Sequence, residues 1–273
     1  MKTTKLSLAM TLTLASLFFV CVPLFASVTD DRIESSIRES YVFKTYLKGD
    51  DIKVQSKDGA VTLTGTVAEG YYKKLAGETV AGIPGVVNVN NKLEEKGEVP
   101  AENSDAWLVA KVQSTLWFHR NVNATETKVF ATDGVVTLLG KATSAAQKDL
   151  TTEYAKDVEG VKDVKNEMTV LPSAMESNKT IANKTTAGEK IDAIGESIDN
   201  ASVTALVKMT LMYHRSTSAL KTTVETKDGV VNLGGSAKNA AEKDLTTKLV
   251  SDVYGVKQVV NTMTVEETKS QVR

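Results

Sequence analysis

The sequence predicts an α/β (α+β) repeat protein, built from three copies of one small module. A stretch with an Asp-Gly turn, Lys57–Leu63, recurs as Thr132–Leu138 and again as Lys227–Leu233. The offsets are 75 and then 95 residues, and the alignment continues without a gap to the end of each unit. Within a unit the hydrophobic pattern changes between the periods of a helix and of a strand. We therefore expect three αββαβ modules, each with a three-stranded mixed sheet packed on two helices, at 28–95, 104–171 and 199–266.

The first helix of each module is predicted by apolar residues at i, i+4 and i+8. These residues are Ile33, Ile37 and Tyr41, then Leu108, Val112 and Leu116, then Val203, Val207 and Leu211. This spacing places them on one face of a helix, which we expect to be buried.

Two strands joined by a tight turn come next. Asp-Gly between two alternating runs favours a type I′ hairpin, because both central residues need positive φ. The turn glycines are Gly59, Gly134 and Gly229, and a second set follows six residues later at Gly65, Gly140 and Gly235. We expect the first set to serve the turn and the second to mark a bulge or a close backbone approach.

The second helix and the last strand complete the module. Ser144 with Gln147, and Asn239 with Glu242, match the capping-box pattern at the start of this helix. The landmarks that follow are Gly85, Gly160 and Gly255, expected to end the helix as C′ glycines, and Asn91, Asn166 and Asn261 in the last strand. A buried amide must be hydrogen-bonded, most simply to a neighbouring loop, so we assign all these repeated residues structural roles.

The segments between the modules bear on how the modules are arranged. A short linker, 96–103, joins repeats 1 and 2, a polar linker, 172–198, precedes repeat 3, and a tail covers 267–273. Domains this small are marginally stable alone, so the repeats either pack on one another or are only modestly stable. We expect repeats 1 and 2 to form a fixed pair and repeat 3 to be tethered more loosely.

Residues 1–26 have the composition of a secretory signal peptide, with cleavage expected after Ala26. Two lysines precede the apolar run Leu6–Val22, and a small residue, Ala26, stands at the expected cut. The alternatives are an uncleaved anchor, for which the run is short, and a lipoprotein anchor on Cys21, before which Phe18–Val20 fits poorly. Cleavage would remove the only cysteine, which excludes disulfides and Cys-ligated metals from the remainder.

The repeated pattern resembles the BON domain, named for bacterial osmoprotection and nodulation proteins. The resemblance rests on the Asp-Gly hairpin, the Leu-x-Gly that follows it, the polar-capped helix and the Gly-Val-x-x-Val-x-Asn ending. It covers all three units, although the common exported relatives carry two, and repeat 1 has Glu69 and Tyr72 in place of a capping pair. The resemblance implies a non-enzymatic periplasmic protein that binds phospholipid surfaces, in envelope maintenance or osmotic stress. The alternative is a protein-interaction or chaperone-like module for other envelope proteins.

Motifs for catalysis, metal binding or cofactor binding are absent from the sequence. His119 and His214 are the only histidines, and each lies in a different module without a neighbouring cysteine, which does not make a metal site. We interpret them as positive side chains that stabilise the C-terminal ends of their helices. The sequence lacks a nucleophile elbow and a phosphate loop, and its nearly balanced charge carries no footprint for nucleic acid. We therefore expect no enzyme activity, no metal and no cofactor.

Residues of the first helix of repeat 2 form the candidate lipid-binding or partner-binding surface. Trp107, Lys111 and Phe118 share one helical stripe beside the buried one, and an exposed stripe of this kind suits a membrane interface or a protein contact. The alternative is that Trp107 packs against a neighbouring repeat. Phe43 and Tyr213 occupy the place of Phe118 in the sister repeats, which favours a core. Because no cluster of basic residues is present, we expect any lipid contact to be a local patch, strengthened by avidity among modules.

Overall fold

The computed structural model describes residues 23–97, 100–171 and 198–266 of the 273-residue chain. The expected signal segment up to residue 22, the linker residues 172–197 and the tail from 267 lie outside the described residues. The expected cleavage point after Ala26 falls within the first described helix.

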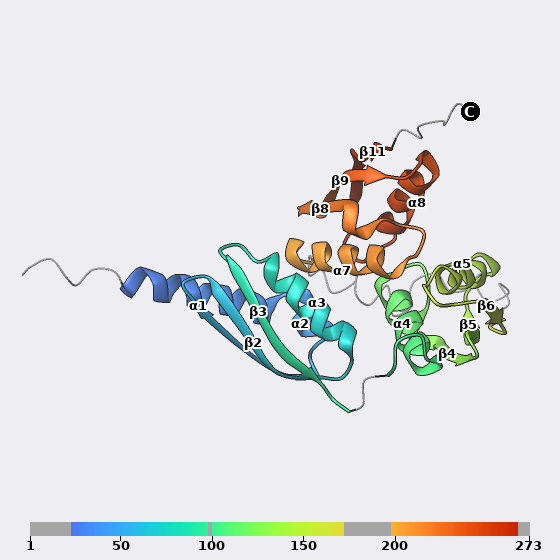
Figure 1. The fold of residues 1–273 in the computed structure, drawn as a ribbon, viewed down its shortest axis with the longest axis horizontal. Coiled ribbons are helices and arrows are strands. Elements are labelled where there is room, and N and C mark those ends of the chain that lie inside the picture. The colour runs from blue at the N-terminus through green and yellow to red at the C-terminus, as the bar shows by residue number, and fades with distance from the viewer. Residues whose placement is uncertain (1–22, 98–99, 172–197, 267–273) are drawn as a thin grey trace, which may run out of the picture.

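The elements of the three modules follow the same order (Figure 1). Module 1 contains α1 (Pro23–Glu39), α2 (Tyr41–Thr45), β1 (Asp51–Lys57), β2 (Ala60–Val67), α3 (Gly70–Ala81) and β3 (Asn88–Glu95). Module 2 contains α4 (Asp105–Phe118), η1 (Ala124–Glu126), β4 (Thr127–Thr132), β5 (Val135–Ala142), α5 (Ala145–Lys156), β6 (Asp163–Asn166) and β7 (Thr169–Val170). Module 3 contains α7 (Asn200–Tyr213), η3 (Ala219–Lys221), β8 (Thr222–Lys227), β9 (Val230–Ala237), α8 (Ala240–Ser251), β10 (Gln258–Asn261) and β11 (Thr264–Val265).

Each module has a mixed sheet whose central strand is the second strand of the hairpin. In module 1, β2 pairs antiparallel with β1 and parallel with β3, so that Leu63 lies opposite Val54 and Asn91. The sister sheets repeat this topology, with the last strand split into β6 and β7 or into β10 and β11. Alternate residues of β2 are buried, which leaves the other face of the strand toward solvent. The predicted αββαβ order and three-stranded mixed sheet are confirmed.

Module 1 differs from its sisters in its first helix. The helix is interrupted at Ser40, whose hydroxyl donates to the backbone of Ile37, and it restarts as α2. The new helix start is completed by module 3: Tyr41 N donates to the carboxylate of Asp199 at 2.8 Å, and Val42 N donates to the hydroxyl of Ser202 at 3.0 Å. Acceptors from a distant part of the sequence thus bond the backbone N–H groups that follow the break in the helix.

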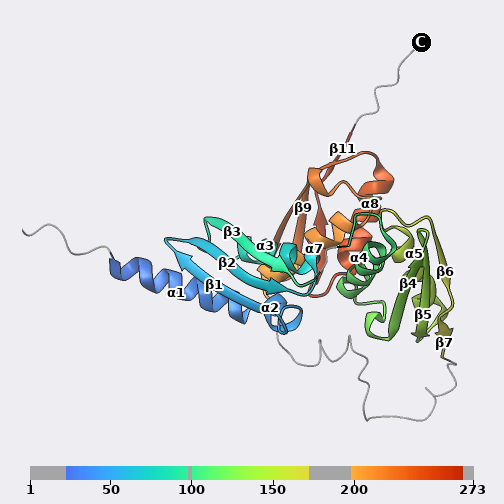
Figure 2. The same cartoon turned by 60° about the horizontal axis from the view of Figure 1, so that its bottom comes forward.

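Module 3 packs on both other modules, with α7 between α3 and α4 (Figures 1 and 2). The expectation that repeats 1 and 2 form the fixed pair, with repeat 3 loosely attached, is therefore wrong. The physical reason is that α7 is buried on two faces. Val203 and Val207 lie in its predicted stripe, and Leu206 and Met209 on the adjoining flank are also fully buried.

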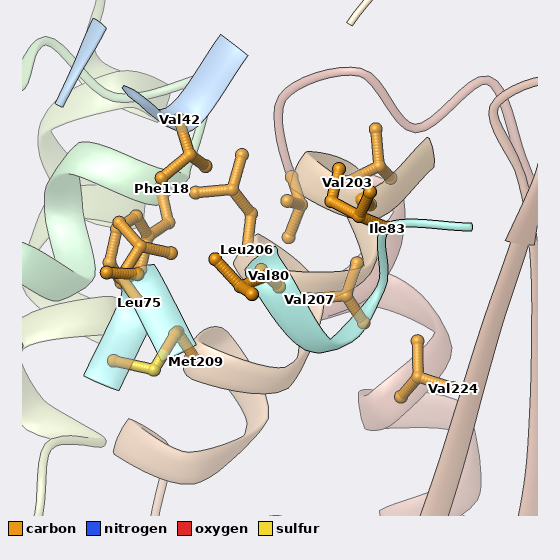
Figure 3. Packing of buried hydrophobic residues seen from close by; sticks show 14 of the residues in the cluster. Val42, Leu75, Val80, Ile83, Phe118, Val203, Leu206, Val207, Met209 and Val224 are labelled. Atoms are coloured by element: carbon orange, nitrogen blue, oxygen red, sulfur yellow. The ribbon is translucent and has the colours of Figure 1, made fainter. Parts of the chain in front are cut away.

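The hydrophobic cores cross the module boundaries. Modules 1 and 3 share one cluster, in which Val80 of α3 lies with Leu206 and Met209 of α7 (Figure 3). Phe118 from module 2 joins that cluster, while Leu249 from module 3 joins the separate core of module 2. The small modules therefore gain stability by packing on one another, which was one of the two alternatives left open by their size.

Candidate functional site

The repeated glycines are explained by the backbone. Gly59 has a φ of +77° and follows Asp58 at +53°, as a type I′ turn requires. A Cβ atom on Gly65 would lie 1.8 Å from the carbonyl oxygen of Asp51, and the equivalent atoms on Gly140 and Gly235 would meet the backbone as closely. The expected turn and close-approach roles agree with this geometry.

The third set of glycines lies elsewhere than expected. Helix α5 ends at Lys156, four residues before Gly160, and its cap residue Asp157 has right-handed helical backbone angles. Gly160 instead occupies the turn before β6 with a φ of +89°, and Gly85 and Gly255 are placed in the same way. The expectation of a C′ glycine is wrong, because an additional turn separates the helix from the strand.

The repeated asparagines fix the second helix to the last strand. The Asn166 amide donates to Lys148 O of α5 at 2.9 Å and to the Thr152 hydroxyl at 2.7 Å, while its oxygen accepts from Met168 N. Asn91 and Asn261 make corresponding bonds to their own helices. The amide is hydrogen-bonded as expected, but its partner is a helix carbonyl and not a loop.

The stripe of α4 proposed as a contact surface turns toward module 3. Phe118 is fully buried and stacks with Tyr213, with ring centroids 6.4 Å apart. The expectation that Phe118 lies on an exposed flank is wrong, because module 3 covers this part of the helix. Lys111 lies 4.1 Å from the centroid of the Trp107 ring and 3.3 Å from the Glu159 carboxylate, so this pair remains at the edge of the interface.

A different face of α4 is exposed. Its exposed residues are Ala106, Gln113 and Trp117, the half-buried Val109 and Ala110 lie between them at helical spacing, and the face carries no charge. Trp117 is 43% exposed, and its backbone oxygen accepts a hydrogen bond from the Tyr46 hydroxyl of module 1. Alignment of the repeats places Trp117 with the apolar residues Val42 and Met212, so the alignment does not indicate that Trp117 is exposed. The position of Trp117, nearly opposite the buried Leu108 on the helix, is the signal that predicts its exposure.

A cluster of polar side chains lies buried between modules 2 and 3. His119 and His214 are the residues that follow α4 and α7, and their Nε2 atoms are 3.1 Å apart. Both side chains are fully buried. The expectation that these histidines serve as positive groups at helix C-termini is wrong, since each is enclosed by the other module.

A carboxylate lies beside each imidazole. Asp157 Oδ2 is 2.9 Å from Nδ1 of His214, and Asp252 Oδ2 is 3.3 Å from Nδ1 of His119. Tyr154 stacks on His119 with ring centroids 3.9 Å apart and donates its hydroxyl to Asp252 at 2.7 Å. Burial, aided by the charge of Asp252, raises the pKa of Tyr154, while burial lowers the pKa of His119 to about 4 against the opposing effect of Asp252.

The interface around the histidines has approximate twofold symmetry. Arg120 N donates to Asp252 O at 2.9 Å, and Arg215 N donates to Asp157 O at the same distance. The guanidinium groups of the same arginines also donate across the interface, Arg120 to Val256 O and Arg215 to Val161 O. Equivalent residues of the two repeats thus meet one another, as the subunits of a twofold dimer do.

The described residues give no sign of a metal centre or a membrane span. No group of three or more His, Cys, Asp or Glu side chains among them is placed to hold a metal ion. No helix in the described part of the chain is both long enough and apolar enough to cross a membrane.

Comparison with known proteins shows three copies of one domain in this chain. A family model described as the BON domain matches residues 29–97, 104–172 and 199–267. Osmotically-inducible protein Y of Escherichia coli is 32% identical over 51% of this chain and 71% of its own length. A 21 kDa hemolysin of Actinobacillus pleuropneumoniae is 32% identical over 50% of this chain and 72% of its own, and the outer membrane lipoprotein DolP of Haemophilus influenzae is 28% identical over the same shares.

Proposed function

Because the chain belongs to the BON domain family in all three of its modules, we propose that it is a non-enzymatic periplasmic protein that binds phospholipid membrane surfaces. Its role would be in envelope maintenance or osmotic stress. Two relatives support an envelope role, since one is named for osmotic induction and the other is named an outer membrane lipoprotein.

The observation that carries the lipid-binding proposal is the exposed α4 face defined above. In a chain with 25% charged residues, this face presents small residues, one amide and Trp117. Tryptophan is favoured at the boundary between headgroups and acyl chains because its ring is large and apolar and its N–H can still bond. Trp107 and Lys111 lie along the adjoining flank and would contribute at the edge of the same contact.

Trp117→Ala is expected to weaken vesicle binding. Loss of a partly exposed tryptophan removes about 1–2 kcal/mol of apolar burial, which corresponds to a ~5–30-fold weaker partition. The measurement is co-sedimentation of the three-module chain with vesicles of phosphatidylglycerol and phosphatidylethanolamine at low salt. Trp107→Ala is expected to have a smaller effect, because that ring is already in contact with Lys111.

Phe130→Ala is the matched control. Phe130 is 51% exposed in the same module, but it lies on β4 and not on the α4 face. Equal losses for the two aromatic substitutions, or no sedimentation of the native chain, would contradict the proposal. A chain that ignores vesicles but captures envelope proteins through Trp117 would instead support the protein-interaction alternative.

A further inference from the structure

One arrangement of hydrogens in the buried histidine pair places an N–H between the facing Nε2 atoms and leaves His119 Nδ1 without a hydrogen-bond partner, as the geometry has it. His214 donates from Nδ1 to Asp157, which leaves a lone pair on its Nε2 when the ring is neutral. His119 can donate its Nε2 hydrogen to that lone pair across 3.1 Å. Nδ1 of His119 then faces Asp252 without a hydrogen between them. The docked pair is therefore built around one hydrogen shared by the two facing Nε2 atoms.

Acid disturbs this arrangement. One added proton could be placed between His119 Nδ1 and Asp252, but it would create a buried imidazolium beside a second imidazole. Two added protons would put an N–H on both Nε2 atoms, so that two cations would point hydrogens at each other across 3.1 Å. Once the modules separate, both rings reach water and can each take a proton.

We infer that the His119–His214 pair is an acid-sensitive latch, which holds module 3 on module 2 at neutral pH and releases it when the histidines are protonated. The inference concerns the contact between modules and does not depend on lipid binding. Release would also uncover Phe118 and Leu249, each of which is now buried in the core of the opposite module.

The other charged groups at the latch do not cancel this effect. Asp157 and Asp252 face the histidines from the ends of α5 and α8, and Asp252 favours a proton on His119. Both carboxylates are already hydrogen-bonded, Asp157 by Ser216 and Asp252 by Asn121 and Tyr154. The guanidinium groups of Arg120 and Arg215 lie within 4.0 Å of the same two carboxylates and oppose any further positive charge.

The direction of the pH effect follows from the facing Nε2 atoms, which leave room for only one hydrogen between them. The pKa of His119 changes with the same sign. Burial lowers it from 6.5 to about 4, so the docked state binds fewer protons than the released state. Docking is therefore fully favoured above pH 6.5 and weakens as the pH falls toward 4. One excluded proton reduces the docking equilibrium about 30-fold between pH 7.5 and pH 5.

The test uses the whole three-module chain, which contains only two histidines and therefore gives two imidazole signals by NMR. Hydrogen exchange is followed in parallel at the amides of Arg120, Arg215 and Tyr254, which donate across the interface. Their protection is expected to fall about 30-fold between pH 7.5 and pH 5, after correction for intrinsic exchange. Amides of the β1–β2 hairpin in module 1 are the internal reference and are expected to keep their protection. Two imidazoles that titrate near 6.5 while the interface amides stay protected would overturn the inference.

Substitutions separate the histidines from the carboxylates. The double variant H119Q/H214Q is expected to lose the pH dependence, whereas K44Q, at the equivalent position of module 1, is expected to keep it. If the double variant loses protection with the same pH profile as the native chain, the carboxylates drive the release and the inference fails. If it does not dock even at pH 7.5, the titration of the native chain decides.

Discussion

At the scale of single residues, Gly65 shows how tightly the module specifies its backbone. Its φ of +116° is costly for a residue with a Cβ atom, and such an atom would overlap the carbonyl oxygen of Asp51 in the neighbouring strand. The same requirement recurs at Gly140 and Gly235. The repeated glycines are therefore constraints on the fold and carry no information about the ligand.

Gly65→Ala is expected to destabilise the chain by ~3 kcal/mol or more, because positive φ and backbone overlap both oppose the added methyl group. Gly49→Ala is the control, since a Cβ atom there would have no heavy atom within 4 Å. It is expected to change the free energy of unfolding by less than about 0.5 kcal/mol. Urea unfolding of both variants checks this, and similar losses would show that the close approach at Gly65 is easily relieved.

At the scale of elements, helix starts are shared between modules. Asp199 caps α7 by accepting from Ser202 N at 2.8 Å, and its second oxygen accepts from Tyr41 N at the start of α2. Ser144 caps α5 within its own module only. One carboxylate thus completes two helices that lie far apart in the sequence.

Asp199→Ala is expected to cost about 2–4 kcal/mol, because a helix cap and the acceptor for a part-buried N–H are lost together. Ser144→Ala removes a cap alone and is expected to cost about 1 kcal/mol. Thermal unfolding measures the loss of stability in each variant, and hydrogen exchange shows which helix loses its amide protection. The shared role of Asp199 would be refuted if α2 kept its protection in the Asp199 variant.

At the scale of the whole molecule, the two interfaces of module 3 differ because the repeats differ at a few positions. Modules 2 and 3 exchange His, Arg and Asp residues, whereas module 1 has Lys44 and Gly82 at the places of His119 and Asp157. Gly82 instead allows close packing, since a Cβ atom on it would lie 3.1 Å from Ala201. Module 1 is therefore joined to module 3 through their shared apolar core, together with the hydrogen bonds of α2 to Asp199 and Ser202 and the Lys208–Glu78 ion pair.

Leu206→Ala is expected to destabilise modules 1 and 3 together by about 2–5 kcal/mol, because the cavity would open in their shared core. Hydrogen exchange in both β2 and β9 measures this coupling. Leu220→Ala is the control, because Leu220 is fully exposed at 102% and is expected to have almost no effect. A loss confined to module 3 would argue against a cooperative unit.

The sequence by itself determined the module. The Asp-Gly turns, the alternating strands and the helical stripe of Leu108, Val112 and Leu116 depend on contacts within one repeat, so their spacing records them. Only the tertiary structure decided what lies against the other side of the first helix in each module. Phe118 and Trp117 are neighbours in the sequence, yet one is buried against module 3 and the other is exposed. His119 acquires its role only because His214, 95 residues away, is brought to 3.1 Å from it. Helical periodicity reports which side of a helix meets its own sheet, but it cannot report which distant module covers another side.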